Sequence, residues 1–285
     1  MSCCFGKVFG RFFIGPHLGI SGDDTPDTST LSELIETFPH WECINRDMPG
    51  THKNLYTMFE TSDVHPDIID AMKIFEKVFV PLKYLRDILI RHGINAISLD
   101  FYTSDLIREK HAVIPKTLDP KRIVFLYIGT NDERKNVSTL SRAFSHLNHL
   151  LIIKTNHSDG LVQSPNIKII TKRLTNTQLA ALYNMCDYVI SATRGEGVGL
   201  PMLEGNYFKK PIIAHDQGVF RDVKQMISVP WIVIPSEEIP IDFTNVPLFL
   251  HKVFYGTWWN VKEHDIRKVL DDIIYKLTHD DTSSI

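Results

Sequence analysis

Short apolar runs alternate with amphipathic segments along nearly the whole chain, and this alternation constrains the fold more than any other feature. Residues 123–128, 150–153 and 167–170 are apolar runs of strand length, whereas residues 137–147 and 175–185 have helical periodicity. Runs without a polar face are typical of parallel strands that helices cover on both sides. The chain is therefore predicted to be α/β with mainly parallel sheets.

The first part of the chain shows the same alternation and predicts a smaller unit. Strands are expected at residues 11–14, 54–59, 77–81 and 96–101, and helices at residues 29–38, 67–75 and 82–92. Residues 103–122 contain two prolines and little periodicity, so they are the predicted linker. The predicted domains are an N-terminal Rossmann-like lobe at 1–117, a second one at 118–256 and a C-terminal segment at 257–285. A cleft between two such lobes is the expected place for a ligand.

Composition limits the partners and the compartment. The chain has 285 residues and a net charge of -3, so no basic field indicates nucleic acid. Four cysteines without metal-ligand spacing favour a reducing, cytoplasmic compartment. No apolar run reaches the roughly 18 residues of a membrane span. Acylation of Cys3 or Cys4, or an interfacial anchor, leaves peripheral membrane contact open, but a buried first strand at 12–14 is favoured over both.

Residues 194–205, R-G-E-G-V-G-L-P-M-L-E-G, carry the densest chemical pattern. Seven residues separate two carboxylates, Glu196 and Glu204, and three glycines interleave the first half. A strand-like run at 186–193 precedes the segment, and a helix is predicted to begin at Leu200. Glycines let backbone amides approach a ligand, and a helix N-terminus favours anions. The segment predicts a pocket for a ligand with phosphate and hydroxyl groups, against the alternative of a turn with two solvated carboxylates.

This segment resembles the E-x7-E signature of retaining nucleotide-sugar glycosyltransferases of family 4. Its familiar form is E-G-F/W-G-L-P-x-x-E-A, from which this chain differs mainly at Val198 and Gly205. The resemblance implies the GT-B fold, in which two Rossmann-like lobes face a central cleft. It also implies that Glu204 holds the ribose hydroxyls. The donor sugar would lie against Glu196 and the amides of Gly197, Val198, Gly199 and Leu200.

A second motif follows the predicted strand at 123–128. Gly129 at the strand end and two adjacent cations, Arg134 and Lys135, suit a diphosphate. The segment resembles the G-T-x-x-x-R-K-N variant of the same family, and Lys135 matches the family's lysine. Thr130 replaces the usual arginine, so Arg134 is expected to supply the second charge. A solvated polar turn is the alternative.

Weaker resemblances extend the expected site. Arg173 lies where family members contact the base, with an ordinary surface arginine as an equal alternative. Gly15 and His17 lie where GT-B enzymes place a loop under the donor sugar, although His17 is equally an ordinary loop histidine. Glu60 replaces a histidine that faces the donor sugar. It is expected to orient the acceptor hydroxyl or accept its proton, with capping of the helix near His65 as the alternative.

The same resemblance extends to two further segments, one before the glutamate motif and one near the C-terminus. Residues 174–187 are similar to the family helix that precedes the motif strand, and its leucines and alanines are expected to be core. Residues 256–267 are similar to a C-terminal segment that precedes a final helix, here predicted at 265–277. In the GT-B fold this last helix packs back on the first lobe. Trp258 and Trp259 are expected to form a packing corner rather than a sugar platform.

The expected function is that of a retaining hexosyltransferase without a metal or other cofactor, since no D-x-D is present. The donor is expected to be a nucleotide sugar, with a slight preference for GDP-mannose over a UDP-sugar. The acceptor would be a hydroxyl of a glycan, a glycoprotein or a lipid-linked molecule. The first lobe is short for the family, so a nucleotide-sugar-binding protein or degenerate subunit without turnover remains the alternative. A GT-B epimerase ranks lower because those enzymes lack this glutamate motif.

Overall fold

The chain divides into two compact units. The computed structural model describes residues 12–14, 54–73, 75–99, 122–244, 246, 251 and 253–279. The first unit comprises Met1–Phe101, Glu196–Val198 and Pro240–Thr257, and the second comprises Tyr102–Gly195, Gly199–Ile239 and Trp258–Ile285. The predicted boundaries at 117 and 256 differ from this division. The chain returns to the first unit in two short segments, and an apolar pattern cannot show which sheet such a segment contacts.

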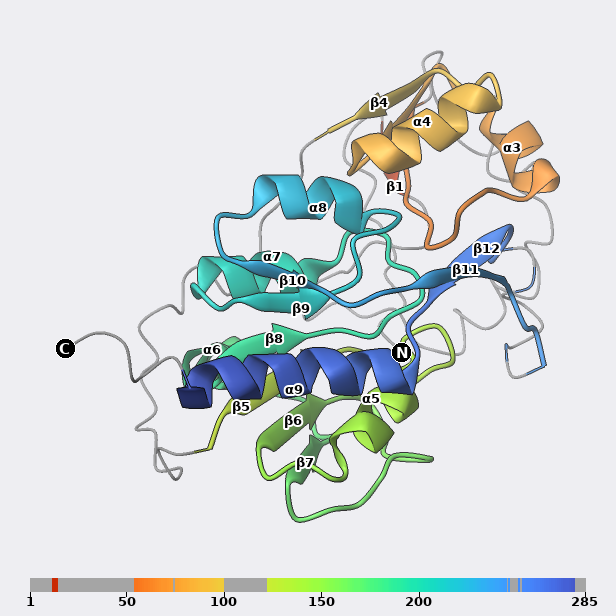
Figure 1. Ribbon diagram of the computed structural model, residues 1–285. Helices are drawn as coiled ribbons and strands as arrows, with labels where there is room; N and C mark the ends of the chain where they lie inside the picture. The colour runs from red at the N-terminus through yellow and green to blue at the C-terminus, as the bar shows by residue number, and fades with distance from the viewer. Residues whose placement is uncertain are drawn as a thin grey trace. The chain divides into compact units, whose positions relative to one another are not determined.

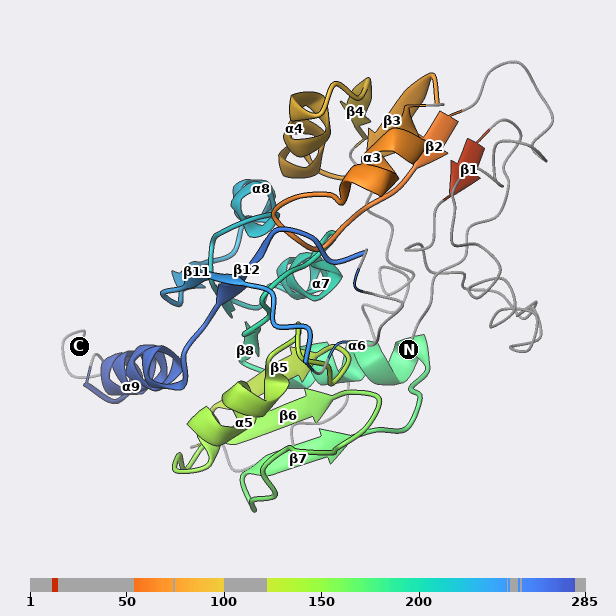
Figure 2. The same ribbon diagram turned by 90° about the vertical axis from the view of Figure 1, so that its right-hand side faces the viewer.

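The first unit contains a four-stranded parallel sheet in the order β1-β2-β3-β4, and Figure 2 shows these strands side by side. The strands are β1 (Phe12–Ile14), β2 (Asn54–Tyr56), β3 (Lys77–Val80) and β4 (Ala96–Ser98). Helix α3 (Pro66–Met72) connects β2 to β3, and α4 (Lys83–Arg91) connects β3 to β4. Parallel neighbours need such crossovers. The predicted strands and helices from residue 54 to residue 99 are confirmed, with shorter bounds, and the predicted helix at 29–38 lies outside the described residues.

The second unit contains a six-stranded parallel sheet in the order β10-β9-β8-β5-β6-β7 (Figure 1). The strands are β5 (Val124–Ile128), β6 (Leu150–Lys154), β7 (Ile167–Ile170), β8 (Tyr188–Ile190), β9 (Ile212–Ala214) and β10 (Trp231–Val233). The chain winds outwards from β5 through β6 to β7, and from β8 through β9 to β10 in the opposite direction. The strand order therefore reverses between the neighbours β5 and β8.

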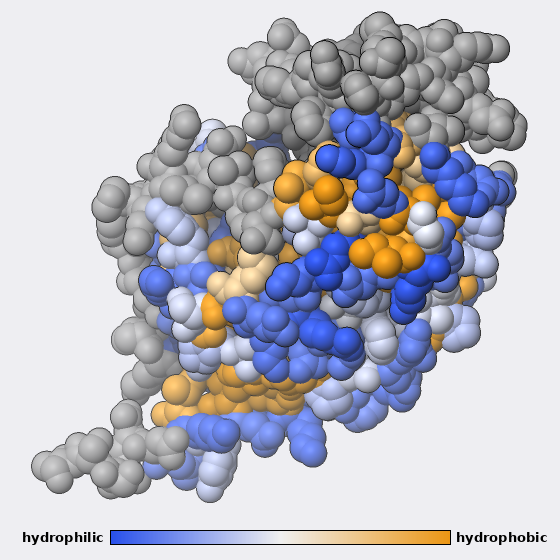
Figure 3. All heavy atoms as spheres, turned by 90° about the horizontal axis from the view of Figure 1, so that it is seen from above, coloured by the Kyte–Doolittle hydropathy of each residue, from blue (hydrophilic) through white to orange (hydrophobic). Residues whose placement is uncertain are grey.

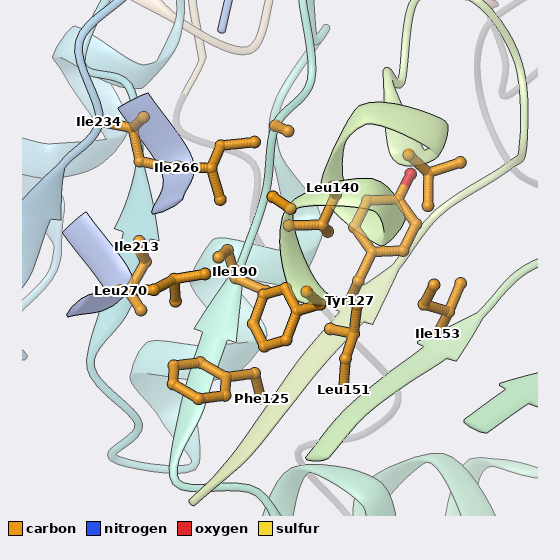
Figure 4. Close-up of a cluster of buried hydrophobic side chains, with 14 of the residues drawn as sticks. Phe125, Tyr127, Leu140, Leu151, Ile153, Ile190, Ile213, Ile234, Ile266 and Leu270 are labelled. Atoms are coloured by element: carbon orange, nitrogen blue, oxygen red, sulfur yellow. The ribbon is translucent and has the colours of Figure 1, made fainter. Parts of the chain in front are cut away.

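Helices cover both faces of this sheet, which explains the continuous apolar strands. They are α5 (Val137–Phe144), α6 (Asn176–Met185), α7 (Leu200–Tyr207), α8 (Phe220–Met226) and α9 (Glu263–His279). One face packs against α5 and α9, and Figure 4 shows side chains from the strands and both helices converging there. The alternate residues Val189 and Ile212 point to the other face, where they contact Gly205 of α7. Tyr183 of α6 stacks on Phe208 at the end of α7, so these two helices are neighbours.

The final helix belongs to the core of the second unit. Ile266, Leu270 and Ile273 of α9 are buried in one cluster with Phe125 and Ile190 of the sheet. The predicted helix at 265–277 is present. Its apolar face is buried in the core of the second unit, whereas the sequence predicted that the helix packs back on the first lobe. Helical periodicity identifies an apolar face without identifying the surface that it covers.

A two-stranded sheet, β11 (Glu237–Pro240) and β12 (Thr257–Asn260), completes the described elements. Trp258 in β12 is only 1% exposed, which agrees with a packing role. On the face seen in Figure 3, hydrophobic residues form small groups between hydrophilic ones. Within the described ranges, no helix is both long and apolar enough to cross a bilayer.

Candidate functional site

Two sequence-selected segments meet at the edge of the six-stranded sheet. Residues 129–136 follow the carboxyl end of β5, and residues 191–195 follow the carboxyl end of β8. These strands are neighbours at the point where the strand order reverses. Ligands of open α/β sheets bind outside the carboxyl ends of the strands at such a point. The fold therefore places both segments at the expected ligand edge of the second unit.

Arg134 connects these segments. Its carbonyl accepts a hydrogen bond from the amide of Arg194 at 2.7 Å, and its guanidinium Nη1 donates to the carbonyl of Gly195 at 2.7 Å. The Thr193 hydroxyl donates to the same Gly195 carbonyl at 2.9 Å. Arg134 is only 9% exposed. The sequence predicted Arg134 as a cation for a diphosphate, and the structure adds a contact that fixes the turn before Glu196.

Arg194 holds three segments together. Its guanidinium forms an ion pair with the Glu133 carboxylate and donates from Nη1 to the Glu133 carbonyl at 3.0 Å. Its Nε donates to Asn260 Oδ1 of β12 at 3.1 Å, and its carbonyl accepts from the amide of Trp259 at 2.9 Å. The side chain is 16% exposed. The sequence predicted no role for Arg194, although its place at the start of the glutamate motif was a usable signal.

The loop after β5 is a closed turn around Asp132. The Thr130 hydroxyl donates to Asp132 Oδ2 at 2.5 Å, and the amide of Lys135 donates to Asp132 Oδ1 at 2.9 Å. Partial burial raises the pKa of Asp132, but Arg134, the Thr130 hydroxyl and Lys135 together hold it below its ordinary value. A Cβ on Gly129 would lie 2.6 Å from the Tyr127 hydroxyl oxygen, so this position favours glycine. The sequence did not predict a role for Asp132, which places one negative charge beside the two expected cations.

Lys135 and Asn136 lead directly into α5. Asn136 adopts a left-handed conformation with a φ of 52°, and its Nδ2 donates to the carbonyl of Val261 at 3.0 Å. This turn places the N-terminus of α5 after the carboxyl end of β5. Unpaired amides and the helix dipole make such an N-terminus suitable for an anion. A diphosphate at this helix N-terminus stays a prediction of the sequence.

The start of α7 is fixed by close packing. Gly199 has a φ of 80°, and a Cβ there would lie 2.6 Å from Phe220 Cε1. The amide of Met202 donates to the Gly199 carbonyl at 2.9 Å, which closes the first turn. Leu200 is 48% exposed beside this buried glycine. Glycine at this position therefore satisfies both the backbone conformation and the contact with α8.

Glu204 accepts a hydrogen bond from a buried tyrosine. The Tyr183 hydroxyl lies 2.5 Å from Glu204 Oε2. Burial and the adjacent Glu204 carboxylate raise the pKa of Tyr183 well above its ordinary value, so the phenol stays protonated and donates. Glu204 itself is partly exposed. The sequence predicted only core residues in the helix at 175–185 and did not predict this contact.

Glu60 and Glu196 both belong to the first unit. A Cβ on Gly197 would lie 2.8 Å from Met58 Sδ, so Gly197 packs against the residue two positions before Glu60. Met58 and Gly197 therefore lie side by side, and both glutamates are partly exposed. The N-cap of α3 is His65, whose Nδ1 accepts from the amide of Asp67 at 3.1 Å. The alternative that Glu60 caps this helix is wrong.

Four predicted site residues remain, which are Arg173, Val198, Gly15 and His17. Arg173 is exposed in the loop between β7 and α6. Val198 is buried, with 8% of its surface exposed. Gly15 and His17 lie outside the described residues.

The comparisons with known proteins agree with this geometry. Residues 109–237 match the family described as Glycosyl transferases group 1. The matched range contains both segments at the sheet edge. No curated protein matches the chain significantly in sequence.

Similar solved structures show the fold. WaaG, a glycosyltransferase involved in lipopolysaccharide biosynthesis, is 10% identical with a TM-score of 0.56, and the match covers 92% of this chain and 78% of WaaG. TarM is 13% identical with a TM-score of 0.52, and the match covers 84% of this chain and 47% of TarM. The pneumococcal O-GlcNAc transferase GtfA, solved with UDP and GlcNAc, is 13% identical with a TM-score of 0.52, and the match covers 81% of this chain and 46% of GtfA.

The chain has the GT-B fold. The predicted fold class is therefore confirmed. The match spans about half the length of TarM and of GtfA, at 47% and 46%.

Proposed function

We propose that this GT-B protein transfers a hexose from a nucleoside diphosphate sugar to a hydroxyl acceptor, with retention and without a metal, as a member of family 4. The observation that carries the proposal is the pairing of residues 129–136 with residues 193–195 where the strand order reverses between β5 and β8. Both segments lie within the matched range. GtfA, solved with UDP and GlcNAc, supports the choice of a nucleotide-sugar donor.

The donor's diphosphate would bind at the start of α5. Lys135 and Arg134 supply positive charge, and the helix N-terminus supplies oriented amides. These groups would stabilise the charge of the departing diphosphate, which is the task of a metal ion in other transferases. Glu204 would accept hydrogen bonds from the ribose hydroxyls, and Arg173 would lie near the base. We favour GDP-mannose, with UDP-sugars as the alternative.

The sugar would be held by Glu196 and the amides from Gly197 to Leu200. An acceptor oxygen forms its bond to the anomeric carbon on the same face from which the phosphate oxygen leaves, so the configuration is retained. The acceptor proton passes to the departing phosphate oxygen. Glu60 would orient the acceptor hydroxyl, and the contact between Met58 and Gly197 in the first unit supports this role. The acceptor would be a glycan, a glycoprotein or a lipid-linked molecule, met in the cytoplasm or at a membrane surface.

Donor binding and turnover test the proposal together. A thermal-shift panel of GDP-mannose, UDP-GlcNAc and ADP-glucose identifies the donor, since a ligand at about 100 times its dissociation constant adds about 2.7 kcal/mol of stability. Release of the nucleoside diphosphate is then followed with and without EDTA. We expect release to persist in EDTA. Glu204→Ala should weaken binding about tenfold or more, whereas Asp271→Ala, an exposed carboxylate of α9, should leave it unchanged. Absence of binding to all three donors overturns the proposal.

A binding protein without turnover is the second candidate. The observation that favours it is the small sheet of the first unit, which has four strands within the described residues against six in the second unit. The first lobe of a GT-B enzyme carries the acceptor site, so a reduced first unit affects transfer before it affects donor binding. This candidate predicts a clear thermal shift with one donor and no release of its nucleoside diphosphate.

A further inference from the structure

Tyr183 is a buried polar group for which the proposed function has no use. Its ring is 0% exposed and stacks on Phe208, with centroids 5.1 Å apart and planes 5° apart. Its hydroxyl donates to Glu204 Oε2 at 2.5 Å and lies 3.5 Å from the Pro201 carbonyl. A buried tyrosine hydroxyl usually has a hydrogen-bond partner. Here that partner is a carboxylate of the candidate site.

The tyrosine is held more firmly than the glutamate that it contacts. Helix α6 begins with a capping box in which Thr175 and Gln178 each bind the other's backbone amide. A tyrosine has two side-chain torsions, and the stack on Phe208 restricts both. Glu204 is partly exposed and has three torsions, the last of which is broad. A hydrogen bond from a fixed donor therefore restricts the rotation of this carboxylate.

We propose that Tyr183 is a positioning residue that holds one oxygen of Glu204 and so sets the direction from which the carboxylate meets a vicinal diol. A carboxylate offers about four acceptor sites, so it can accept from the phenol and from other donors together. A ribose presents two adjacent hydroxyl donors, which a fixed carboxylate can accept together. The inference rests on the proposed function, because it assumes that Glu204 holds the ribose of the donor.

The test compares ligands that differ only in the diol. The affinities of wild type, Tyr183→Phe, Glu204→Ala and the double variant are measured by calorimetry for GDP, UDP and ADP. The tightest of these is then compared with its 2′,3′-dideoxy counterpart. Tyr183→Phe keeps the ring on Phe208 and removes only the hydroxyl. Tyr188→Phe is the matched control, because this half-buried tyrosine of β8 stacks on Phe125 in the same unit.

We expect Tyr183→Phe to weaken binding of the intact nucleotide about tenfold, which corresponds to about 1.4 kcal/mol. Binding of the dideoxy nucleotide should change less than about twofold. Tyr188→Phe should change neither. The double variant should bind no more weakly than Glu204→Ala alone, because the phenol acts through the glutamate.

An equal loss for both nucleotides, or additive losses in the double variant, overturns the inference and assigns Tyr183 a structural role. In another outcome, wild type binds the intact nucleotide more tightly than the dideoxy nucleotide and Tyr183→Phe shows the same preference. That outcome overturns the inference and leaves the proposed function intact. A wild-type protein that binds none of the three diphosphates contradicts the proposed function, and the inference is lost with it. Thermal unfolding without ligand shows that each variant is folded before it is titrated.

Discussion

Arg194 contributes to the local structure through the shape of its guanidinium. It binds the carbonyl and carboxylate of Glu133 and the amide oxygen of Asn260 at the same time. A lysine keeps the charge but cannot reproduce three fixed directions. We predict that Arg194→Lys lowers the free energy of unfolding by about 2 kcal/mol, as expected for charged hydrogen bonds. Urea denaturation measures the change. Arg221→Lys on the exposed side of α8 is the control and should change it little.

A comparison of Gly199 with Gly160 separates two reasons for a glycine, which are a positive φ and the lack of room for a Cβ. Both adopt a positive φ, of 80° and 69°, but a Cβ on Gly160 would meet nothing within 4 Å, whereas one on Gly199 would lie 2.6 Å from Phe220 Cε1. Gly160→Ala should cost about 1 kcal/mol for the left-handed conformation. Gly199→Ala should cost about 1–3 kcal/mol more because the ring must move. Equal losses in denaturant titrations would show that Phe220 yields freely.

At the scale of elements, the apolar pattern predicted the parts that are buried on both sides. Residues of β5 and helix α5 are almost entirely buried, so their sequences carry a clear signal. Strand β11, with the sequence E-E-I-P, is mostly exposed and ends in proline, and the sequence did not predict it. The two loops at the sheet edge were predicted because glycines mark them. The hydrogen bond between Tyr183 and Glu204 joins α6 to α7. It depends on how the two helices pack, and sequence spacing does not predict that packing.

Gly205 shows how closely α7 packs on the sheet. A Cβ there would lie 2.7 Å from Ile212 Cδ1 and 3.0 Å from Val189 Cγ2. Alanine is the better helix former by about 1 kcal/mol, but overpacking costs about 1–3 kcal/mol. We therefore predict that Gly205→Ala destabilises the protein in chemical denaturation. Ile212→Val removes the nearest carbon, so the double variant should lose less than the sum of the two single losses. Strict additivity would contradict this account.

Helix α8 is joined to the end of β9 by a pH-dependent contact. Lys224 Nζ lies 2.9 Å from Asp216 Oδ2, and this hydrogen bond lowers the pKa of Asp216 below 3.8 although burial opposes it. A carboxyl with a lowered folded pKa stabilises the protein above its unfolded pKa, and the contribution is lost as the pH falls through the folded pKa.

We predict that Asp216→Asn lowers the free energy of unfolding by about 0.5 kcal/mol at neutral pH, the range of a partly exposed pair. The difference from wild type should shrink as the pH falls below about 4, where the unfolded carboxyl is protonated. Urea titrations of both proteins at several pH values measure this difference. A difference that is constant from neutral to acid pH would assign the loss to something other than the ion pair.

At the scale of the whole molecule, α9 completes the core of the second unit from outside the matched range, which ends at residue 237. Leu270 is 0% exposed and Leu277 is 48% exposed on the same helix. Leu270→Ala should cost about 2–5 kcal/mol, a large share of the stability of a typical domain. Leu277→Ala should change it by less than about 0.5 kcal/mol. Similar effects in equilibrium unfolding would place α9 outside the core.

The interleaving of the two units has a consequence for synthesis. The first unit includes Pro240–Thr257, where Tyr255 pairs with Asp63 and the Thr257 carbonyl accepts from the amide of Ser62. A ribosome adds about 5–20 residues per second, and the N-terminus of the chain emerges first. The start of the first unit therefore waits for its own last segment while most of the second unit emerges. A gene cut at the linker would consequently separate Ser62 and Asp63 from Thr257 and Tyr255, and would not yield two complete folding units.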